Sequence, residues 1–295
     1  MVSAKIGNGV QSIGSKAFYG CSSLADVQIG NGVLTIESSA FSNCIKLSSV
    51  NIPQNVTNIE NFVFYGCSIL NKVILADSNG ELTLGSNGSS PLFSDCPLDS
   101  VYIGRNIAYQ TTSNYGYSPF YRNTSLRSVT ITDKETEISQ NEFYGCSNLK
   151  NVRIGNNVKK IGDWAFSSCS SLDFFSFGIG VEAIGKEAFS DCTAITRLIS
   201  HAVVPPTCGS QALDDINKWN CKLYVPEGSL SAYQQADQWK DFFFIEESTG
   251  IRDIKMDATT SNRYYTLDGY LYTQPHKGIN IIKRSDGKSY KVIAK

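Results

Sequence analysis

Apolar and polar residues alternate in short stretches that return at a fixed distance along the first 200 or so residues. Within one unit, apolar residues stand three, six and eight positions after a cysteine, as Leu24, Val27 and Ile29 do. A polar residue separates the last two, which predicts a short strand with one buried face. A Gly-Asn-Gly turn follows, and a second apolar pair, Val33 and Ile36, precedes a small residue and a phenylalanine.

The repeat has a period of 23 residues. Five of the seven distances between successive phenylalanines are 23, and the other two, 29 and 27, contain insertions. A fixed period in the twenties is typical of a solenoid, in which each coil closes the core of its neighbour. We therefore predict a repeat solenoid of about eight coils over residues 1–205, built mostly of short β-strands with short helical turns. The units are marked by Phe18/Cys21, Phe41/Cys44, Phe64/Cys67, Phe93/Cys96, Phe120/Asn123, Phe143/Cys146, Phe166/Cys169 and Phe189/Cys192.

Seven of the nine cysteines occupy one phase of the repeat, where free thiols, disulfides and a metal site are the alternatives. Seven cysteines cannot all pair with one another, and the remaining one of the eight units has Asn123 at this position. The chain has two histidines and no Cys-x-x-Cys pair. The exchange of cysteine for asparagine indicates a small buried group in the turn, so we predict a ladder of buried free thiols and no metal site. Cys208 and Cys221 lie outside this phase and are the only candidates for a disulfide, which the sequence leaves open.

The pattern resembles the BspA-like leucine-rich repeat family, of the type found in Treponema pallidum. The family motif IGxxAFxxCxxLxxVxI stands nearly intact at Ile13–Ile29, Ile161–Phe177 and Ile184–Leu198. Many members are cell-surface or secreted proteins of Bacteroidales, treponemes and some mucosal protists. The resemblance implies a leucine-rich repeat solenoid that is secreted by a bacterium or displayed at its outer surface. It is looser at Glu142, which replaces the small residue before phenylalanine, and we expect a local distortion there.

The chain begins inside a repeat, since Met1 falls in the phase of Leu24. We identify no signal-peptide or N-terminal cap pattern among the printed residues before the first repeat. We therefore expect this sequence to be a piece of a longer exported precursor.

A different pattern begins after residue 205. We expect residues 206–248 to cap the solenoid, with a last strand at Lys222–Val225, Ser229 as N-cap and a short amphipathic helix at Leu230–Trp239. A terminal coil leaves an open core and an unpaired strand, and both need covering. The stretch LYVPEGSLSAYQQADQWKDF resembles the closing element of BspA-like proteins.

Residues 249–295 carry β-hairpin signals. Asp-Gly pairs at 268–269 and 286–287 separate stretches rich in Tyr, Leu, Ile and Val, which predicts a small antiparallel β tail. The segment resembles C-terminal segments of exported Bacteroidetes proteins, including sorting domains read by the type IX secretion machinery. A sorting signal and a packing module that stays on the protein are the alternatives.

Composition narrows the function classes. The 295 residues are 41% hydrophobic and 18% charged, with a net charge of −1. No basic run and no apolar run near 18 residues is present, so we expect neither a nucleic-acid partner nor a membrane span. His201 and His276 stand in no catalytic motif, and Asp77–Glu81 lacks the later glutamate of a calcium loop. We predict no enzyme activity, no cofactor and no metal.

The residues five and seven positions after each cysteine should point away from the core. Aligned on successive coils, they form a ribbon along one face of the stack, and repeat proteins bind partners through extended faces of this kind. Ile74, Tyr102, Phe174 and Ile199 are expected to be exposed there among polar neighbours such as Ser176.

Two insertions, Asp77–Pro91 and Arg105–Pro119, occur at the same phase of successive coils. We expect them to project side by side from one edge and to be replaceable by a four-residue turn without loss of folding. The second carries three tyrosines, which suit a partner protein or stacked sugar rings. With the outward face, the candidate ligand-binding residues are Tyr102, Tyr109, Tyr115, Tyr117, Tyr121, Arg153, Phe174 and Arg197.

These features together favour a non-enzymatic cell-surface or secreted protein that works by adhesion. By family resemblance, the partner is a host extracellular-matrix or plasma protein, or another cell-surface protein. A glycan-binding module for polysaccharide capture and a passive structural stalk are the alternatives.

Overall fold

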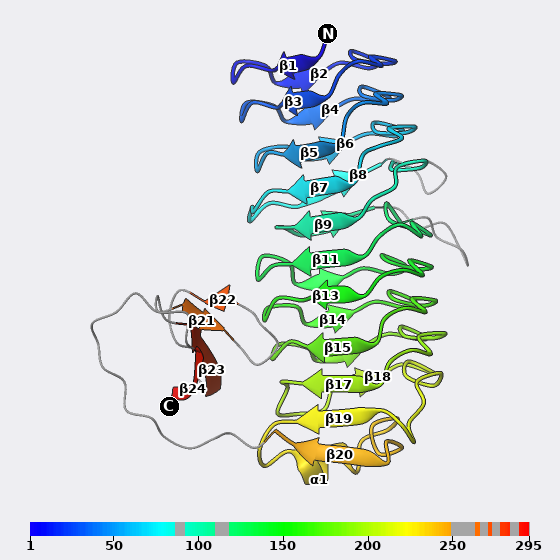
Figure 1. Ribbon diagram of the computed structural model, residues 1–295, viewed down its shortest axis with the longest axis vertical. Helices are drawn as coiled ribbons and strands as arrows, with labels where there is room; N and C mark the ends of the chain where they lie inside the picture. Colours follow the sequence, from blue (N-terminus) through cyan, green and yellow to red (C-terminus); the bar gives the residue numbers. More distant parts are fainter. Residues whose placement is uncertain are drawn as a thin grey trace.

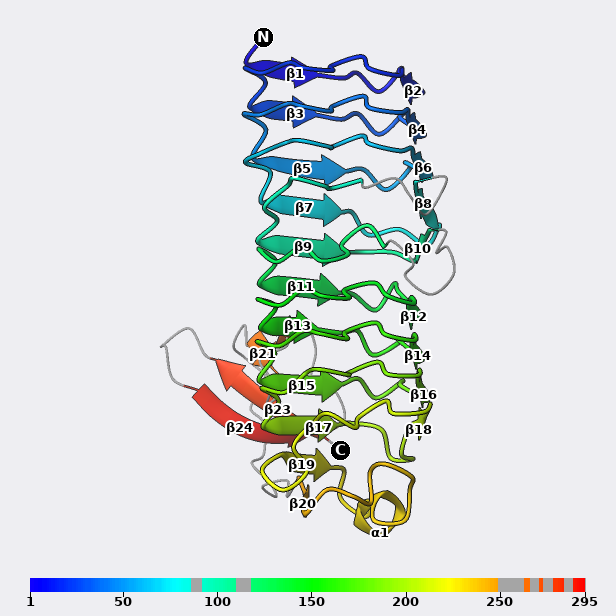
Figure 2. The same ribbon diagram turned by 90° about the vertical axis from the view of Figure 1, so that its right-hand side faces the viewer.

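The computed structural model is a solenoid whose coils stack in a nearly straight column (Figure 1). It describes residues 1–85, 92–109 and 118–248, together with four strands between residues 263 and 294. Strands run in parallel rows along two sides of the column (Figure 2). The predicted solenoid is confirmed, but it has about 10 turns rather than eight. The rows continue past residue 205, where the sequence motif ends.

The first row holds the strand that follows each cysteine turn. Its register places equivalent residues of successive coils side by side, as Val73 beside Val101. Polar residues such as Ser49 and Asn51 point outward while Val50 and Ile52 are buried. The row consists of β1 (Ser3–Lys5), β3 (Asp26–Gln28), β5 (Ser49–Ile52), β7 (Lys72–Leu75), β9 (Ser100–Ile103), β11 (Ser128–Ile131), β13 (Asn151–Arg153), β15 (Phe174–Phe177), β17 (Arg197–Ser200), β19 (Lys222–Val225) and β20 (Phe244–Glu247).

The second row lies on another side of the column and is interrupted once. Its pairing runs from β2 to β10 and resumes from β12 to β18, so the break falls at the second insertion. The row consists of β2 (Ser12–Ile13), β4 (Thr35–Ile36), β6 (Asn58–Ile59), β8 (Leu82–Leu84), β10 (Ile107–Ala108), β12 (Glu137–Ile138), β14 (Lys160–Ile161), β16 (Ala183–Ile184) and β18 (Thr207–Cys208).

The core is a set of columns of like side chains. The repeat phenylalanines form one continuous stack from Phe18 to Phe189, with neighbouring ring centroids 5.0–5.7 Å apart and nearly parallel planes. Each inner ring is buried by the coils on both sides, which explains why one repeat cannot fold alone. The strand, phenylalanine and cysteine positions of the repeat are buried except in the first unit, where Phe18, Cys21 and Ile29 are half-buried because only the first coil covers them.

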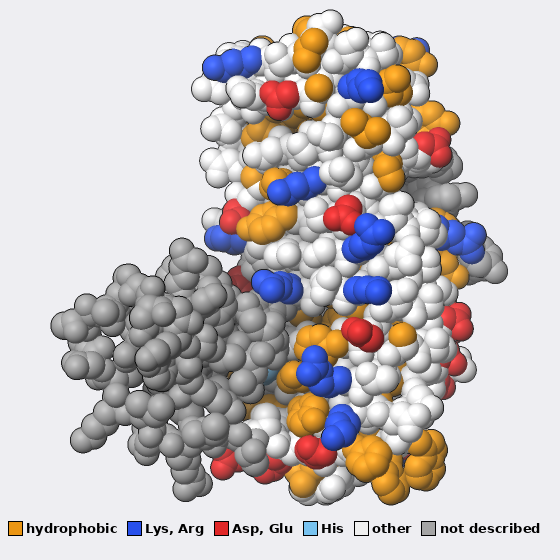
Figure 3. All heavy atoms as spheres, viewed as in Figure 1, with side chains coloured by type: hydrophobic (Ala, Val, Ile, Leu, Met, Phe, Trp, Pro, Cys, Tyr) orange, Lys and Arg blue, Asp and Glu red, His pale blue; other side chains and the backbone are white. Residues whose placement is uncertain are grey.

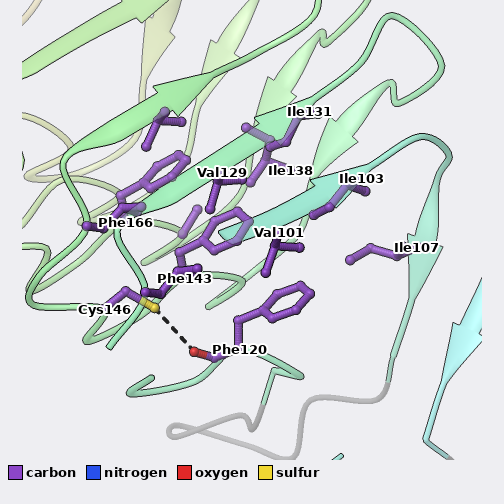
Figure 4. Close-up of a cluster of buried hydrophobic side chains, with 14 of the residues drawn as sticks. Val101, Ile103, Ile107, Phe120, Val129, Ile131, Ile138, Phe143, Cys146 and Phe166 are labelled. Carbon is purple, nitrogen blue, oxygen red and sulfur yellow. Dashed lines mark hydrogen bonds between the residues drawn. The ribbon is translucent and has the colours of Figure 1, made fainter. Parts of the chain in front are cut away.

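The cysteine column lies next to the phenylalanine stack. From Cys44 onward, each thiol of the column donates a hydrogen bond to a phenylalanine carbonyl of the preceding coil, as Cys146 Sγ does to Phe120 O at 3.2 Å (Figure 4). Cys21 is half-buried and the other six cysteines of the column are buried, and all are free. The predicted ladder of free thiols is therefore confirmed. Cys208 and Cys221 are also free thiols, so the disulfide that the sequence left open does not form.

The C-terminal end of the solenoid differs from the prediction in two ways. The helix α1 (Leu230–Tyr233) spans four residues instead of Leu230–Trp239, and among the described residues the Ser229 hydroxyl makes no capping bond. The strand β19 lies at Lys222–Val225 as expected, but β20 pairs with it in parallel and is the last strand of the row. Trp239 is buried and donates from Nε1 to Pro206 O at 2.8 Å, so it closes the core.

Four strands after residue 262 form a separate antiparallel sheet in the order β22-β21-β23-β24. The small antiparallel β tail predicted from the sequence is thereby confirmed. Its two Asp-Gly pairs lie outside the described residues. The strands are β21 (Arg263–Tyr265), β22 (Leu271–Tyr272), β23 (Gly278–Lys283) and β24 (Ser289–Ala294).

The two insertions are in part built into the solenoid. Asp77–Pro91 contains β8, and Arg105–Pro119 contains β10; both strands belong to the second row. Leu82, Leu84 and Ile107 are buried in the core. The prediction that each whole insertion projects is therefore wrong, and replacing either one by a short turn would remove core residues.

Candidate functional site

The six predicted ligand-binding residues that the structure describes lie in three separate places. Tyr102, Arg153, Phe174 and Arg197 share the outer face of the first row. Tyr102 and Arg153 stand in one line of that face, with Thr130 between them. Phe174 lies directly beside Arg197, whose guanidinium is 4.3 Å from the centroid of the ring. This pair gives the face an ordered cationic and aromatic spot.

The outer face is less exposed than the sequence suggested. Ile74, Tyr102, Phe174 and Ile199 are half-buried, and Ser176 is buried at 3% exposure. The expectation that Ser176 is solvent-exposed is wrong because larger neighbours in the row, such as Ile199 beside it, shade a small side chain. On the view of the solenoid in Figure 3, apolar, positive and negative side chains are interspersed.

Tyr102 is held in place by an acidic neighbour. Its hydroxyl donates to Asp77 Oδ1 at 3.0 Å. Burial of the ring, together with the hydrogen bond to Asp77, raises the pKa of Tyr102 to about 12. The hydroxyl therefore remains a neutral donor and fixes the orientation of the Asp77 carboxylate.

The tyrosines of the second insertion do not form one surface. Tyr109 packs against the core, and its hydroxyl donates to Gln140 O at 3.0 Å, so it serves the joint between two coils. Tyr121 stacks on Tyr144, with ring centroids 5.2 Å apart and planes 7° from parallel. Tyr115 and Tyr117 lie outside the described residues.

Two buried glutamates near this joint were not recognised as a pair from the sequence. Glu135 stands four residues after Ile131, where the next coil has Val158, and Glu142 stands where four of the other coils have alanine. Both are fully buried, and three of their four carboxylate oxygens have no hydrogen-bond partner among the described residues. Burial raises the pKa of both groups, that of Glu142 to about 8.

Arg105 is a third ionisable residue in the core. It is 1% exposed, and its guanidinium donates to five backbone carbonyls of earlier coils. These acceptors are Ala76 O, Gln54 O, Val56 O, Ile52 O and Pro53 O, at 2.6–3.4 Å. Arg105 therefore fastens the turn that leaves β5 to the coil of β9, and burial lowers its pKa.

The turns between the two rows normally stack into a ladder of their own. Asn31 N donates to Asn8 Oδ1 at 3.0 Å, and Asn55 Nδ2 donates to Asn31 O at 2.8 Å. The same contacts resume later, where Asn156 N and Asn157 Nδ2 donate to Asp133. The ladder is interrupted between these two stretches.

The ladder is interrupted because the link between β9 and β10 is shorter than the corresponding links in the other coils. Three residues separate β9 from β10, whereas five or six separate the two strands in every other coil from β1 to β18. A turn is therefore missing at this level, and a hollow of about 440 Å³ opens in its place. Lys134 reaches past the missing turn, and its Nζ donates to Asn79 Oδ1 at 2.8 Å. The hollow is lined by Gln54, Asn55, Asp77, Ser78, Asn79, Gly80 and Lys134.

This hollow was not predicted from the sequence, although the short link of three residues between β9 and β10 can be counted there. Among the described residues, no three histidine, cysteine, aspartate or glutamate side chains are grouped so that they could hold a metal ion. In the same part of the chain, no helix has the length and hydropathy needed to cross a membrane.

Known proteins share this architecture. The family model described as BspA type leucine rich repeat region, in six copies, matches residues 1–118 and 113–203. A leucine-rich repeat protein from Bacteroides ovatus ATCC 8483 aligns at 25% sequence identity and a TM-score of 0.50, over 84% of this chain and 66% of that chain. A T. pallidum leucine-rich repeat protein aligns at 26% identity and a TM-score of 0.42, over 55% of this chain and 72% of that chain.

A third solved structure is a leucine rich cell surface protein from Faecalibacterium prausnitzii A2-165. It aligns at 18% identity and a TM-score of 0.30, over 85% of this chain and 80% of that chain. The comparison with curated proteins found no match. The chain spans just under two thirds of the length of the B. ovatus protein.

Proposed function

Because the chain belongs to the BspA-type leucine-rich repeat family, we propose that it is a secreted or cell-surface bacterial protein that adheres to other proteins and catalyses no reaction. Membership of a leucine-rich repeat family and the solenoid fold support a binding or structural role. The partners in this proposal are a host extracellular-matrix or plasma protein, or another cell-surface protein.

The outer face of the first row is the observation that carries this proposal. Parallel pairing repeats its side chains at about 4.8 Å per coil, so a partner meets a long, ordered surface instead of a single pocket. Arg197 is exposed and lies over the ring of Phe174, and Arg153 is exposed on β13. Arginine and aromatic residues contribute a large share of the binding energy at protein interfaces.

An array of host matrix and plasma proteins tests the proposal. The full chain is compared with a variant carrying Arg153→Ala, Phe174→Ala and Arg197→Ala. The control carries Glu137→Ala and Lys160→Ala, which remove an exposed 2.8 Å ion pair on the second row. Hits that the first variant loses and the control keeps support adhesion through this face. Hits that survive in both, or an absence of hits, count against it.

Glycan binding is the second candidate function, and the polar hollow beside Tyr102 favours it. Its lining side chains are amides, one carboxylate, one hydroxyl and one ammonium. A chain that binds neither proteins nor glycans would act as a structural stalk.

A further inference from the structure

The hollow between β7 and β11 is shaped by the loss of one turn from a closely packed ladder. Elsewhere the turns stack so tightly that a Cβ added to Gly180 would lie 2.2 Å from Asn156 O. At the level of β9 no such turn fills the space, so the polar groups of the turns before and after it face the hollow. A ligand placed here would occupy the position of a peptide turn.

The floor of the hollow is firmly built. Arg105 is buried, and its guanidinium donates to Gln54 O at 3.1 Å and to Val56 O at 2.7 Å, which fixes the backbone on both sides of the lining residue Asn55. On the opposite wall, Asp77 is held by Tyr102, and Ser78 N donates to Gly104 O at 3.0 Å. The Asp77 carboxylate and the backbone around Asn55 and Ser78 are therefore positioned before any ligand arrives, which lowers the entropic cost of binding.

The chemistry of the lining restricts the ligand. Gln54, Asn55 and Asn79 each present a planar amide that can donate and accept, and Asp77 presents a carboxylate. Planar groups of this kind pair with two neighbouring hydroxyls of a sugar ring. One carboxylate and one ammonium, from Asp77 and Lys134, balance each other, so the hollow favours a neutral ligand.

The size and surroundings also favour a small ligand over a peptide. The volume falls within the roughly 300–1,000 Å³ of small-molecule sites, but those sites are mostly apolar. A ligand for a polar hollow must be polar over most of its surface. Peptides commonly add to a free strand edge, and β7, β9 and β11 are each paired on both edges.

We propose that this hollow binds one neutral sugar residue of a glycan, with Gln54, Asn55, Asp77, Asn79 and Lys134 as its hydrogen-bonding groups. The assignment rests on the second candidate function above. It is separate from the protein-binding face, because Arg153, Phe174 and Arg197 do not line the hollow.

A matched pair of variants tests the site. Asn55 and Asn157 occupy equivalent turn positions, are both exposed, and donate the same ladder bond, to Asn31 O at 2.8 Å and to Asp133 O at 2.7 Å. Asn55→Ala and Asn157→Ala should therefore cost similar stability, and only the first removes a lining group. Thermal unfolding followed by circular dichroism checks that both variants are folded.

Saturation-transfer NMR of the full chain measures binding of glucose, galactose, mannose, N-acetylglucosamine and N-acetylneuraminic acid. We expect at least one neutral sugar to bind the parent and Asn157→Ala with equal affinity, and to bind Asn55→Ala at least tenfold more weakly. An absence of neutral-sugar binding, equal binding by both variants, or binding of the anionic sugar alone would overturn the proposal.

A short peptide panel forms the last arm of the experiment. Peptide binding that Asn55→Ala abolishes, without sugar binding, would overturn the sugar assignment. Loss of sugar binding in Asn55→Ala with array hits unchanged separates this site from the proposed adhesive face. The two sites are also separate if the variant carrying Arg153→Ala, Phe174→Ala and Arg197→Ala loses the array hits and still binds the sugar.

Discussion

Replacing Glu142 by glutamine should change the stability of the solenoid by an amount that depends on pH. Glu142 is fully buried, and burial raises its pKa from the ordinary 4.5 to about 8. The hydrogen bond from Ser139 N, at 2.7 Å, lowers the pKa, and the charge of Glu137 raises it. The folded protein therefore keeps a proton near neutral pH that the unfolded chain releases.

The difference between the two pKa values sets both the sign and the size of the effect. A raised pKa of an acid favours folding below the unfolded value of 4.5, and this stabilisation is lost as pH rises toward about 8. One pKa unit corresponds to about 1.4 kcal/mol, so the parent loses about 3 kcal/mol of unfolding free energy from this group between about pH 5 and about pH 8. Glutamine does not titrate, so the variant escapes this loss.

Denaturant unfolding at both pH values, followed by circular dichroism, measures the effect. The stability of Glu142→Gln relative to the parent should rise by about 3 kcal/mol from the lower to the higher pH. The control is Glu60→Gln. Glu60 Oε2 accepts a similar hydrogen bond from Ser38 N, at 2.9 Å, but Glu60 is half-buried whereas Glu142 is fully buried. A parent-to-variant difference that is the same at both pH values would refute the reasoning.

Three further outcomes follow from the core and the turns. Arg105→Met should lower the unfolding free energy by about 3 kcal/mol, because five carbonyls lose a charged donor; the midpoint of urea unfolding checks this. Burial raises the pKa of Cys146 and Cys192 to about 12, so their thiols should react with Ellman's reagent only after denaturant is added. Gly180→Ala should cost about 1–3 kcal/mol, seen as a lower Tm, since its Cβ would lie 2.2 Å from Asn156 O.

The repeating parts of the fold were predictable because the same sequence pattern recurs in eight units. The spacing of phenylalanine, cysteine and the Leu-Val-Ile positions gave the strand phase, the buried columns and the thiol ladder. The sequence pattern did not predict a strand that pairs with the first row but lacks the repeat motif. Phe244–Glu247 continues the first row because β19 offers it an open edge, and no local signal requires this.

The charged core residues escaped prediction for a different reason. Arg105 turns inward because the link from β9 to β10 is too short to form the usual turn, and four of its five carbonyl partners lie about 50 residues earlier in the chain. Glu142 was noticed as a departure from the small residue before phenylalanine, and Glu135 could have been found by counting from Ile131. Their pairing across the joint could not, because it depends on how two coils stack.

The candidate site was predictable only in outline. The register of the first row placed Tyr102, Arg153, Phe174 and Arg197 on one face, as expected. Tyr109 was expected on a projecting loop but packs against the core, because the sequence did not reveal that the start of the second insertion is part of the second row. The hollow around Asn55 arises from an absent turn, which a search for chemical motifs does not detect.

The affinity of the strongest array hit for the Arg197→Ala variant is the most direct test of adhesion through the first row. Surface plasmon resonance would compare the parent with Arg197→Ala and with Lys160→Ala. Lys160→Ala is the control, because Lys160 lies on β14 of the second row. The proposal predicts at least a tenfold weaker Kd for Arg197→Ala, about 1.4 kcal/mol or more, and an unchanged Kd for Lys160→Ala. Equal affinities for all three proteins would contradict it.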